Sequence, residues 1–483
     1  MRYLTGHASG RKAAVGMNDT ALAARLPITL AMRLVVFSDD WGRHPSSCQH
    51  LVRRLAPKYR TLWVNTIGMR RVTGSWADLR RGVQWGLKCL ASRAHGGAAA
   101  SGACHGASAG SSEHASHQPQ VASPWMWPSF RGGLPRRVNA AAMRRAVRRW
   151  TGDNCDDVVI LTTLPIAADL TCNEPRPSGS GFCHPQPLAD ARGSLKPGAC
   201  DGPDFRGRGH FRGRAVYYCV DDFSVWPGVD GRTMLTMERE LLAKVDRVAA
   251  VSQVLCDKLR DMGRDDVQLL THGVDLDHWR VISSRPSRDT APAPVAVFWG
   301  LLDERLDVNW CAALGRALSQ RSGKLVLIGP PGSSFPGSLA PDAPGIELHP
   351  AVPYAALPAL LSQLCPGVLV MPYRDLPVTR AMQPLKFKEY LATGLPVVGR
   401  SLPGVAEWAD AADLVADEQS FVARVLHRMT HGVDATQAAA RKRLAHESWE
   451  AKAAALEQLL LSCLADGGRD VRNPRMTRAS SAA

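Results

Sequence analysis

The feature that most constrains the fold of this sequence is an alternation of short apolar segments with amphipathic ones, which occurs twice along the chain. The apolar segments have the length and composition of buried strands. Strands that alternate with helices form parallel sheets with helices on both faces. In the first series, strands are predicted at residues 33–38, 61–65, 157–161, 215–220 and 247–251. In the second, strands are predicted at 295–299, 324–328, 346–348, 367–371 and 396–398, and helices at 308–320, 354–364, 384–393 and 446–464.

The two series predict an α/β protein with two doubly wound, Rossmann-like domains. The proline-rich residues 281–294 are interpreted as a linker between an N-terminal domain, 32–280, and a C-terminal domain, 295–464. Ligands of such sheets bind at the carboxyl ends of the strands, so a site is expected in a cleft between the domains. Segments of low complexity predict insertions into the first domain and disordered tails at both ends, at about 94–120 and 171–214 and at 1–31 and 465–483.

No apolar run approaches the roughly 18 residues that a membrane-spanning helix needs, which excludes an integral membrane protein. The apolar stretch 26–32 is too short for a secretory signal and lacks a convincing cleavage site. The cysteines are scattered without a C-x-x-C pair, which is typical of a reducing compartment. The spacing of Cys172, Cys183, His184 and Cys200 does not match a zinc site. We therefore predict a cytoplasmic chain with no metal.

The net charge of +15 is concentrated in the first third of the chain. Residues 1–150 contain 23 lysines and arginines but only 5 aspartates and glutamates. The positive electrostatic field of so many basic residues attracts nucleic acid or an anionic lipid surface. No motif known to recognise nucleic acid accompanies it here. Residues 72–93 have the spacing of an interfacial amphipathic helix. The alternative is a core-packed helix with a solvated basic side and no partner.

Polar residues directly follow two of the predicted strands. Asp40 and His44 lie in the loop 39–47 after the first strand, and Asp221 and Asp222 end the strand 215–220. Because the carboxyl ends of parallel strands share one edge of the sheet, these four residues are candidates for catalysis. The alternative for each is a helix N-cap or a turn residue.

The most informative segment is 383–398, QPLKFKEYLATGLPVV in one-letter code. Pro384 suits the first position of a short helix and Gly394 its C-terminal cap. Lys386 then stands in the first turn, beside free N–H groups that bind phosphate oxygens, and Glu389 lies one turn deeper on the same face. The pair predicts a receptor for a nucleoside diphosphate, with phosphate on Lys386 and ribose on Glu389. A surface ion pair is the alternative.

The pattern Pro-Leu-Lys-x-x-Glu-Tyr-Leu-Ala-x-Gly-x-Pro-Val-Val resembles the donor-binding helix of GT-B glycosyltransferases of family 4, the group-1 family. The likeness covers about 32–68, 121–170 and 215–464. It implies the GT-B fold with a C-terminal helix, a nucleotide-sugar donor, a retaining transfer and no obligatory metal or other cofactor. The donor-binding residues that it implies are Gly300, Pro384, Leu385, Lys386 and Glu389. Shorter segments that resemble the family follow in the expected order at 218–224, 250–252, 272–275, 298–300, 325–329 and 368–372.

The sequence departs from the family pattern at two places. Many members carry a Glu-x7-Glu pair that ends at this helix, but Ala381 stands eight residues before Glu389. The usual Gly-Arg-Leu phosphate clamp is also altered, because Leu301 follows Gly300 and the nearest cation is Arg305. Arg305 is therefore a candidate donor-binding residue in a changed loop. The sequence is most similar to divergent members that attach sugars to envelope or capsular polysaccharides.

Together these features predict a hexosyltransferase that acts on a lipid-linked or polysaccharide acceptor, peripherally bound to the inner face of the plasma membrane. Lys386 would stabilise the leaving diphosphate. Asp222, Asp221 or Asp40 would stabilise an oxocarbenium-like transition state, with His44 as an acceptor or phosphate contact. A sugar-nucleotide epimerase of the same architecture and a catalytically inactive scaffold protein are the alternatives.

Overall fold

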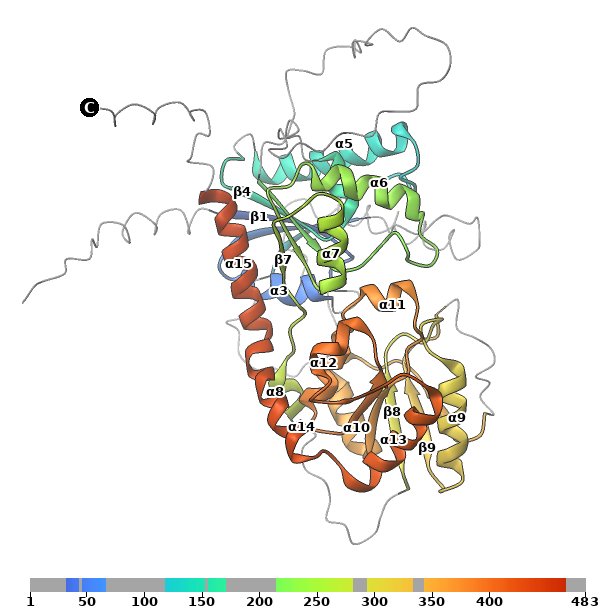
Figure 1. Cartoon of the computed structure of the whole chain (residues 1–483). Helices are drawn as coiled ribbons and strands as arrows, with labels where there is room; N and C mark the ends of the chain where they lie inside the picture. Colours follow the sequence, from blue (N-terminus) through green and yellow to red (C-terminus); the bar gives the residue numbers. More distant parts are fainter. Residues whose placement is uncertain are drawn as a thin grey trace, which may run out of the picture.

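The structure, a computed structural model, describes residues 32–42, 46–66, 118–152, 155–170, 214–280, 293–332 and 343–465 of the 483-residue chain. These residues form two lobes, each built around one parallel sheet (Figure 1). Within these ranges, no helix has the length and hydropathy that a membrane span requires.

The first lobe contains a seven-stranded sheet in the order β3-β2-β1-β4-β5-β6-β7, and all its described strand pairs are parallel. Helices cover the sheet, so its central strands are buried along nearly their whole length. The strands are β1 Arg33–Ser38, β2 Arg60–Asn65, β3 Gln120–Ala122, β4 Val158–Thr162, β5 Arg214–Cys219, β6 Arg247–Ala250 and β7 Val267–Leu269. The helices are α3 Ser47–Leu55, α5 Gly133–Thr151, α6 Gly231–Leu242 and α7 Gln253–Asp261, with the 3-10 helix η1 Pro165–Asp169 after β4.

The second lobe contains a six-stranded parallel sheet in the order β10-β9-β8-β11-β12-β13. Its strands are β8 Val295–Trp299, β9 Lys324–Ile328, β10 Ile346–His349, β11 Val368–Met371, β12 Val397–Arg400 and β13 Asp413–Val415. Its helices are α8 Leu276–Trp279, α9 Val308–Ser319, α10 Leu357–Leu364, α11 Pro377–Ala381, α12 Leu385–Ala392, α13 Glu418–His431 and α14 Ala435–Ala440, with the 3-10 helices η3 Tyr354–Ala356, η4 Pro403–Trp408 and η5 Arg441–Glu447.

The C-terminal helix α15, Trp449–Ala465, crosses from the second lobe back to the first (Figure 1). Its apolar side, which includes Trp449, Leu456 and Leu460, is buried in the core of the first lobe. Glu457 at its surface pairs with Lys58 at 2.7 Å. The predicted range 295–464 placed this helix in the second domain, and the packing corrects that assignment. An amphipathic pattern shows that a helix has a buried face but not which core buries it.

The boundary between the predicted domains also shifts at its other end. Val274 and Trp279 are fully buried in the core of the second lobe, although the predicted first domain extended to residue 280. The chain therefore passes from the first core to the second between Leu270, which is buried in the first lobe, and Val274.

Every strand predicted from the sequence is present, but three short strands were missed. They are β3 and β7, the two edge strands of the first sheet, and β13, an edge strand of the second, each only three residues long. Three residues carry too little alternation to be recognised. Gln120, the first residue of β3, had been placed in an insertion. The predictions for residues 1–31, 72–93, 94–117, 171–213, 281–292 and 466–483, which include the cysteines and histidine between 172 and 200, lie outside the described residues.

Candidate donor site between the lobes

Side chains that follow strands of both sheets meet at the junction of the lobes. Arg305, which follows β8, lies with its guanidinium carbon 5.7 Å from the ring centre of Trp226, which follows β5. The Ser252 hydroxyl, after β6, donates a hydrogen bond to the carbonyl oxygen of Ala381 at 2.6 Å. The carboxyl ends of the two sheets are therefore brought together, as expected for doubly wound domains that share a site.

Lys386 stands in the first turn of α12, where backbone N–H groups have no partner within the helix. Its Nζ lies 3.4 Å from the Tyr373 hydroxyl and 5.5 Å from the ring centre of Phe298. No described carboxylate forms an ion pair with it. A half-buried lysine without a counter-ion at a helix N-terminus is an arrangement that binds phosphate.

Gly300 makes room for this lysine. The residue has φ +146°, and a Cβ atom built on it would lie 2.0 Å from Nζ of Lys386. A side chain at position 300 would therefore strain the backbone and displace the lysine. The helix itself begins one residue later than predicted, because Pro384 is its N-cap and Leu385 its first residue. Leu385 is half-buried and packs against the core of the first lobe.

Glu389 lies on the same helix but points into a different environment. It is only 4% exposed, and the indole N–H of Trp299 donates a hydrogen bond to its carboxylate at 3.4 Å. Burial raises the pKa of Glu389 to about 7, and the nearby charge of Lys386 opposes the shift. A surface ion pair between these residues, the alternative considered from the sequence, is wrong because Glu389 is buried.

Arg305 is only partly available to an anion. Its guanidinium donates three hydrogen bonds to the carboxylate of Asp303, at 2.8 to 3.1 Å. The pair is largely shielded, with side-chain exposures of 14% and 11%. Arg305 is therefore held rigidly beside Trp226 and the first lobe, and its charge is shared with Asp303.

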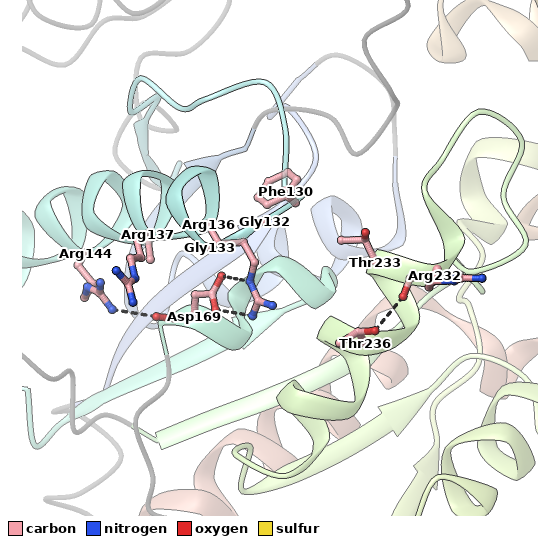
Figure 2. Close-up of a pocket in the computed structure, with 11 residues that line it drawn as sticks. Phe130, Gly132, Gly133, Arg136, Arg137, Arg144, Asp169, Arg232, Thr233 and Thr236 are labelled. Carbon is pink, nitrogen blue, oxygen red and sulfur yellow. Dashed lines mark hydrogen bonds and ion pairs between the residues drawn. The ribbon is translucent and has the colours of Figure 1, made fainter. Parts of the chain in front are cut away.

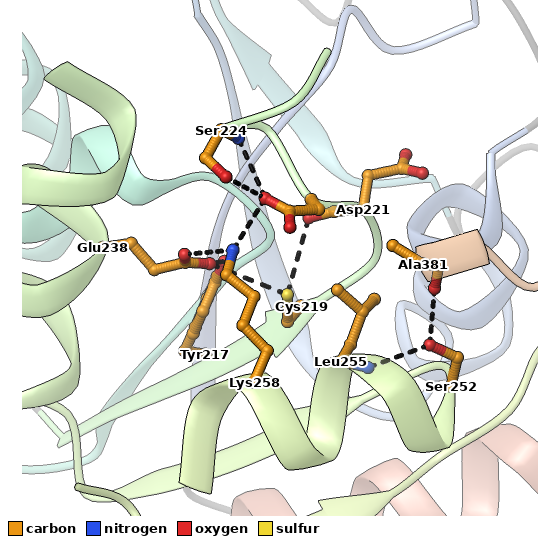
Figure 3. Close-up of polar contacts among 10 residues, drawn as sticks. Tyr217, Cys219, Asp221, Ser224, Glu238, Ser252, Leu255, Lys258 and Ala381 are labelled. Atoms are coloured by element: carbon orange, nitrogen blue, oxygen red, sulfur yellow. Dashed lines mark hydrogen bonds and ion pairs between the residues drawn. The ribbon is translucent and has the colours of Figure 1, made fainter. Parts of the chain in front are cut away.

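The structure separates the two aspartates that follow β5. The Asp222 carboxylate accepts hydrogen bonds from the Lys258 ammonium at 2.7 Å and from the backbone N–H and hydroxyl of Ser224 (Figure 3). Although burial alone would raise the pKa of Asp222, these bonds lower it. Lys258 also contacts Glu238 at 2.7 Å. Asp222 thus belongs to a structural network.

Asp221 points away from that network in Figure 3. Burial raises the pKa of its carboxyl group to about 7, against the opposing charge of Arg305. A carboxyl group with a raised pKa near the junction of two lobes fits a chemical role better than a carboxylate already bound to a lysine.

The loop after β1 is organised by Asp39 rather than by Asp40. Asp39 accepts hydrogen bonds from the side chains of Ser38, Ser46 and Gln49, at 2.9 to 3.0 Å. Gln49 also donates to the backbone carbonyl of Asp40 at 3.1 Å. Asp40 is half-buried at the end of this network. His44 lies outside the described residues.

Several residues of this junction were not predicted. Tyr373, Asp303 and Trp226 contact the candidate cations but come from loops with no recognisable motif. Their position at the carboxyl end of a strand was the available signal. At position 381, where many family members carry a glutamate, the backbone carbonyl of a buried alanine contacts the first lobe instead.

Solved structures with the same architecture cover nearly the whole chain. Anabaena Alr3699/HepE, crystallised with UDP and glucose, is 12% identical with a TM-score of 0.52 and covers 90% of this chain and 99% of its own. The chain has the GT-B fold. A trehalose 6-phosphate synthase from Burkholderia multivorans is 15% identical with a TM-score of 0.52, and the match covers 92% of this chain and all of that one. TarM is 9% identical with a TM-score of 0.52, and the match covers 90% of this chain and 98% of TarM. The GT-B architecture implied by the resemblance to family 4 is confirmed.

One relative shows sequence similarity as well. The protein of Bacillus subtilis (strain 168) named "Putative teichuronic acid biosynthesis glycosyltransferase TuaH" is 26% identical over 216 residues. The match covers 40% of this chain and 52% of TuaH, so the chain spans about half the length of this relative. No protein-family model matches the chain.

Proposed function

We propose that this GT-B protein is a glycosyltransferase that moves a sugar from a UDP-linked donor to an acceptor of envelope polysaccharide synthesis. The observation that carries the proposal is Lys386, a cation without a described counter-ion in the first turn of α12, with Gly300 packed against it. The names of the GT-B neighbours and of TuaH, which refer to UDP and to teichuronic acid, support the choice of donor and acceptor.

In this proposal the second lobe binds the donor. The leaving diphosphate lies against Lys386 and the first turn of α12, after Pro384 and Leu385, and Arg305 provides a second positive charge. These groups neutralise the leaving group without requiring a metal ion. Glu389, buried beneath the site, contacts the ribose once Trp299 releases it.

Asp221 is the carboxylate that we assign to the reaction centre. A retaining transfer passes through an oxocarbenium-like transition state, which a nearby carboxylate stabilises. Asp221 is free of the Lys258 network and lies close enough to Arg305 for their charges to interact. Asp222 and Asp39 support the loops that position it, and Asp40 lies beside them.

The acceptor is proposed to be lipid-linked or a polysaccharide, bound by the first lobe at the inner face of the plasma membrane. The basic character of residues 1–150 supports this placement, because an anionic bilayer contributes about 1 kcal/mol per nearby basic residue.

Thermal unfolding with UDP, GDP, ADP and their sugars tests the donor site. A ligand at 100 times its dissociation constant adds about 2.7 kcal/mol to the free energy of unfolding. We expect a shift with uridine nucleotides that disappears in Lys386→Ala and persists in Lys324→Ala, a control lysine that pairs with Glu347. Equal shifts in both variants would contradict the proposed site.

Product analysis then tests the reaction. With donor and acceptor together, we expect UDP release and a glycoside of unchanged anomeric configuration. A new nucleotide sugar formed from donor alone would instead identify an epimerase. Absence of uridine nucleotide binding, with or without vesicles, would favour a scaffold protein.

A further inference from the structure

A second basic site lies on the first lobe, away from Lys386. A pocket of about 600 Å³ opens between α5, η1 and α6. Figure 2 shows Arg137 and Arg144 on α5, Asp169 of η1 at the centre and Thr233 and Thr236 on α6. Its lining contains four arginines and one carboxylate, and the fourth arginine, Arg232, comes from the first turn of α6.

The carboxylate does not neutralise all four arginines. Arg136 uses Asp169, at 2.6 and 2.9 Å, and also pairs with Glu240. Among the residues that the structure describes, Arg144 donates only to the neutral carbonyl oxygen of Asp169, at 2.8 Å. Within the described ranges, the guanidinium groups of Arg137 and Arg232 have no hydrogen bond or ion pair, and the Arg232 backbone carbonyl accepts only from within its own helix, from the Thr236 hydroxyl at 3.0 Å. The pocket therefore contains two arginines whose guanidinium groups have no described partner, and one arginine, Arg136, that is fixed by two carboxylates.

The remaining lining suits an oxyanion. Gly132, with φ +77°, leads into this 19-residue helix without a side-chain cap, and Gly132 and the first helical residue Gly133 border the pocket, so the positive end of the helix dipole lies beside it. The Thr233 hydroxyl adds a neutral hydrogen-bonding group on the opposite wall, whereas the Thr236 hydroxyl already donates to the backbone carbonyl of Arg232 at 3.0 Å. Arginine forks and hydroxyls are the groups that bind the several oxygens of a phosphate.

Apolar side chains stand on the segment that leads into the pocket. Trp125, Trp127 and Leu134 are 52%, 46% and 72% exposed. The backbone of Trp127 is held in place, because the buried Asn139 of α5 accepts from its N–H and donates to its carbonyl. Exposed tryptophans beside cations are typical of surfaces that meet a lipid interface.

We propose that this pocket binds a phosphate or diphosphate group, and that the exposed tryptophans favour one carried by a lipid. The site goes beyond the proposed transferase, and its test needs no transferase activity. The bound phosphate group could belong to a phosphorylated lipid in a bilayer or to a free phosphorylated compound. The two arms of the experiment distinguish these sources.

In the first arm, pyrophosphate binding is measured by calorimetry with UDP present, so that the donor site is saturated. The test variant is Arg137→Gln/Arg232→Gln. The matched control is Arg145→Gln/Arg149→Gln, which removes the same charge from exposed positions of α5 outside the pocket. Loss of a charge-assisted hydrogen bond should weaken binding by about tenfold or more in the test variant and by less than about twofold in the control.

In the second arm, the same proteins are sedimented with vesicles of phosphatidylcholine alone or mixed equally with phosphatidylglycerol. Weaker sedimentation of only the pocket variant with the mixed vesicles supports a lipid phosphate, and weaker pyrophosphate binding alone supports a free phosphorylated ligand. If the pocket variant and the control behave alike in both arms, the proposal is overturned. Thermal shifts with UDP, unchanged in all these variants, separate this outcome from a failure of the donor site.

Discussion

The charged side chains at the carboxyl ends of the two sheets differ in whether they already have partners. At the edge of the first sheet, carboxylates such as Asp39 and Asp222 are already satisfied by serine, glutamine and lysine side chains. At the edge of the second, Lys386 has no described counter-ion and packs against a glycine. The first edge is thus arranged to hold loops in place, with Asp221 as its exception. The second edge is arranged to receive an anion.

Removing the cation of the second edge should have the largest effect. Lys386→Ala is expected to lower kcat by about 10²- to 10³-fold, because the leaving group loses a preorganised positive charge. Its thermal stability without ligand should be close to that of the parent, since the lysine makes no described ion pair. Steady-state kinetics measure the effect, with Lys324→Ala as control, and a loss below tenfold would show that Arg305 is the main phosphate contact.

Gly300→Ala tests whether the space beside Lys386 matters. The added Cβ would displace the ammonium group, so we expect kcat to fall by about tenfold or more. Gly394→Ala is the matched control, because Gly394 also has positive φ, +78°, but faces open space. Both variants should lose about 1 to 3 kcal/mol of stability from backbone strain. Equal activity of the two variants would show that backbone strain alone accounts for the requirement for glycine at position 300.

The two aspartates after β5 should respond in opposite ways. Asp222→Asn removes the charge that faces Lys258 and should lower the free energy of unfolding by about 1.5 to 3 kcal/mol. Asp221→Asn should not lower the free energy of unfolding, because a neutral amide avoids the cost of burying an ionised carboxylate, and it should lower kcat by about tenfold. Urea unfolding and kinetics on both variants measure these effects. An active Asp221→Asn enzyme would remove Asp221 from the reaction centre.

The last prediction concerns the pH dependence of stability. The pKa of Asp221 is raised to about 7, chiefly by burial, so the folded chain holds this proton more tightly than the unfolded chain does. The contribution of Asp221 to the free energy of unfolding should therefore fall as pH rises from about 4 to about 7, and stay level above that interval. The difference in stability between Asp221→Asn and the parent should grow over the same range. A constant difference would mean that the carboxyl group is ionised throughout.

The sequence predicted the second edge better than the first, and the reason is the distance between partners. Pro384, Lys386 and Glu389 belong to one short helix, so their spacing was informative. Asp222 and Lys258 are 36 positions apart, and the Asp39 network depends on a glutamine ten residues away. Such contacts exist only after the sheet is assembled. The pocket between α5 and α6 could not be predicted for the same reason, although its three arginines on α5 contributed to the charge asymmetry of residues 1–150.

The sequence also could not place α15. Its apolar positions specified a buried face, but either lobe has a core large enough to accept it. The decisive contacts, such as Glu457 with Lys58 and the ring of Trp449 stacked at 4.5 Å on His50, join residues about 400 positions apart.

This return of α15 has a consequence for how the protein is made. During synthesis the first lobe emerges from the ribosome early, but the sheet surface that Trp449, Leu456 and Leu460 cover stays exposed until residues 449–465 have been translated. A nascent chain with an open apolar face aggregates or is held by chaperones. We therefore expect the two lobes to complete folding together, although each contains its own sheet and core.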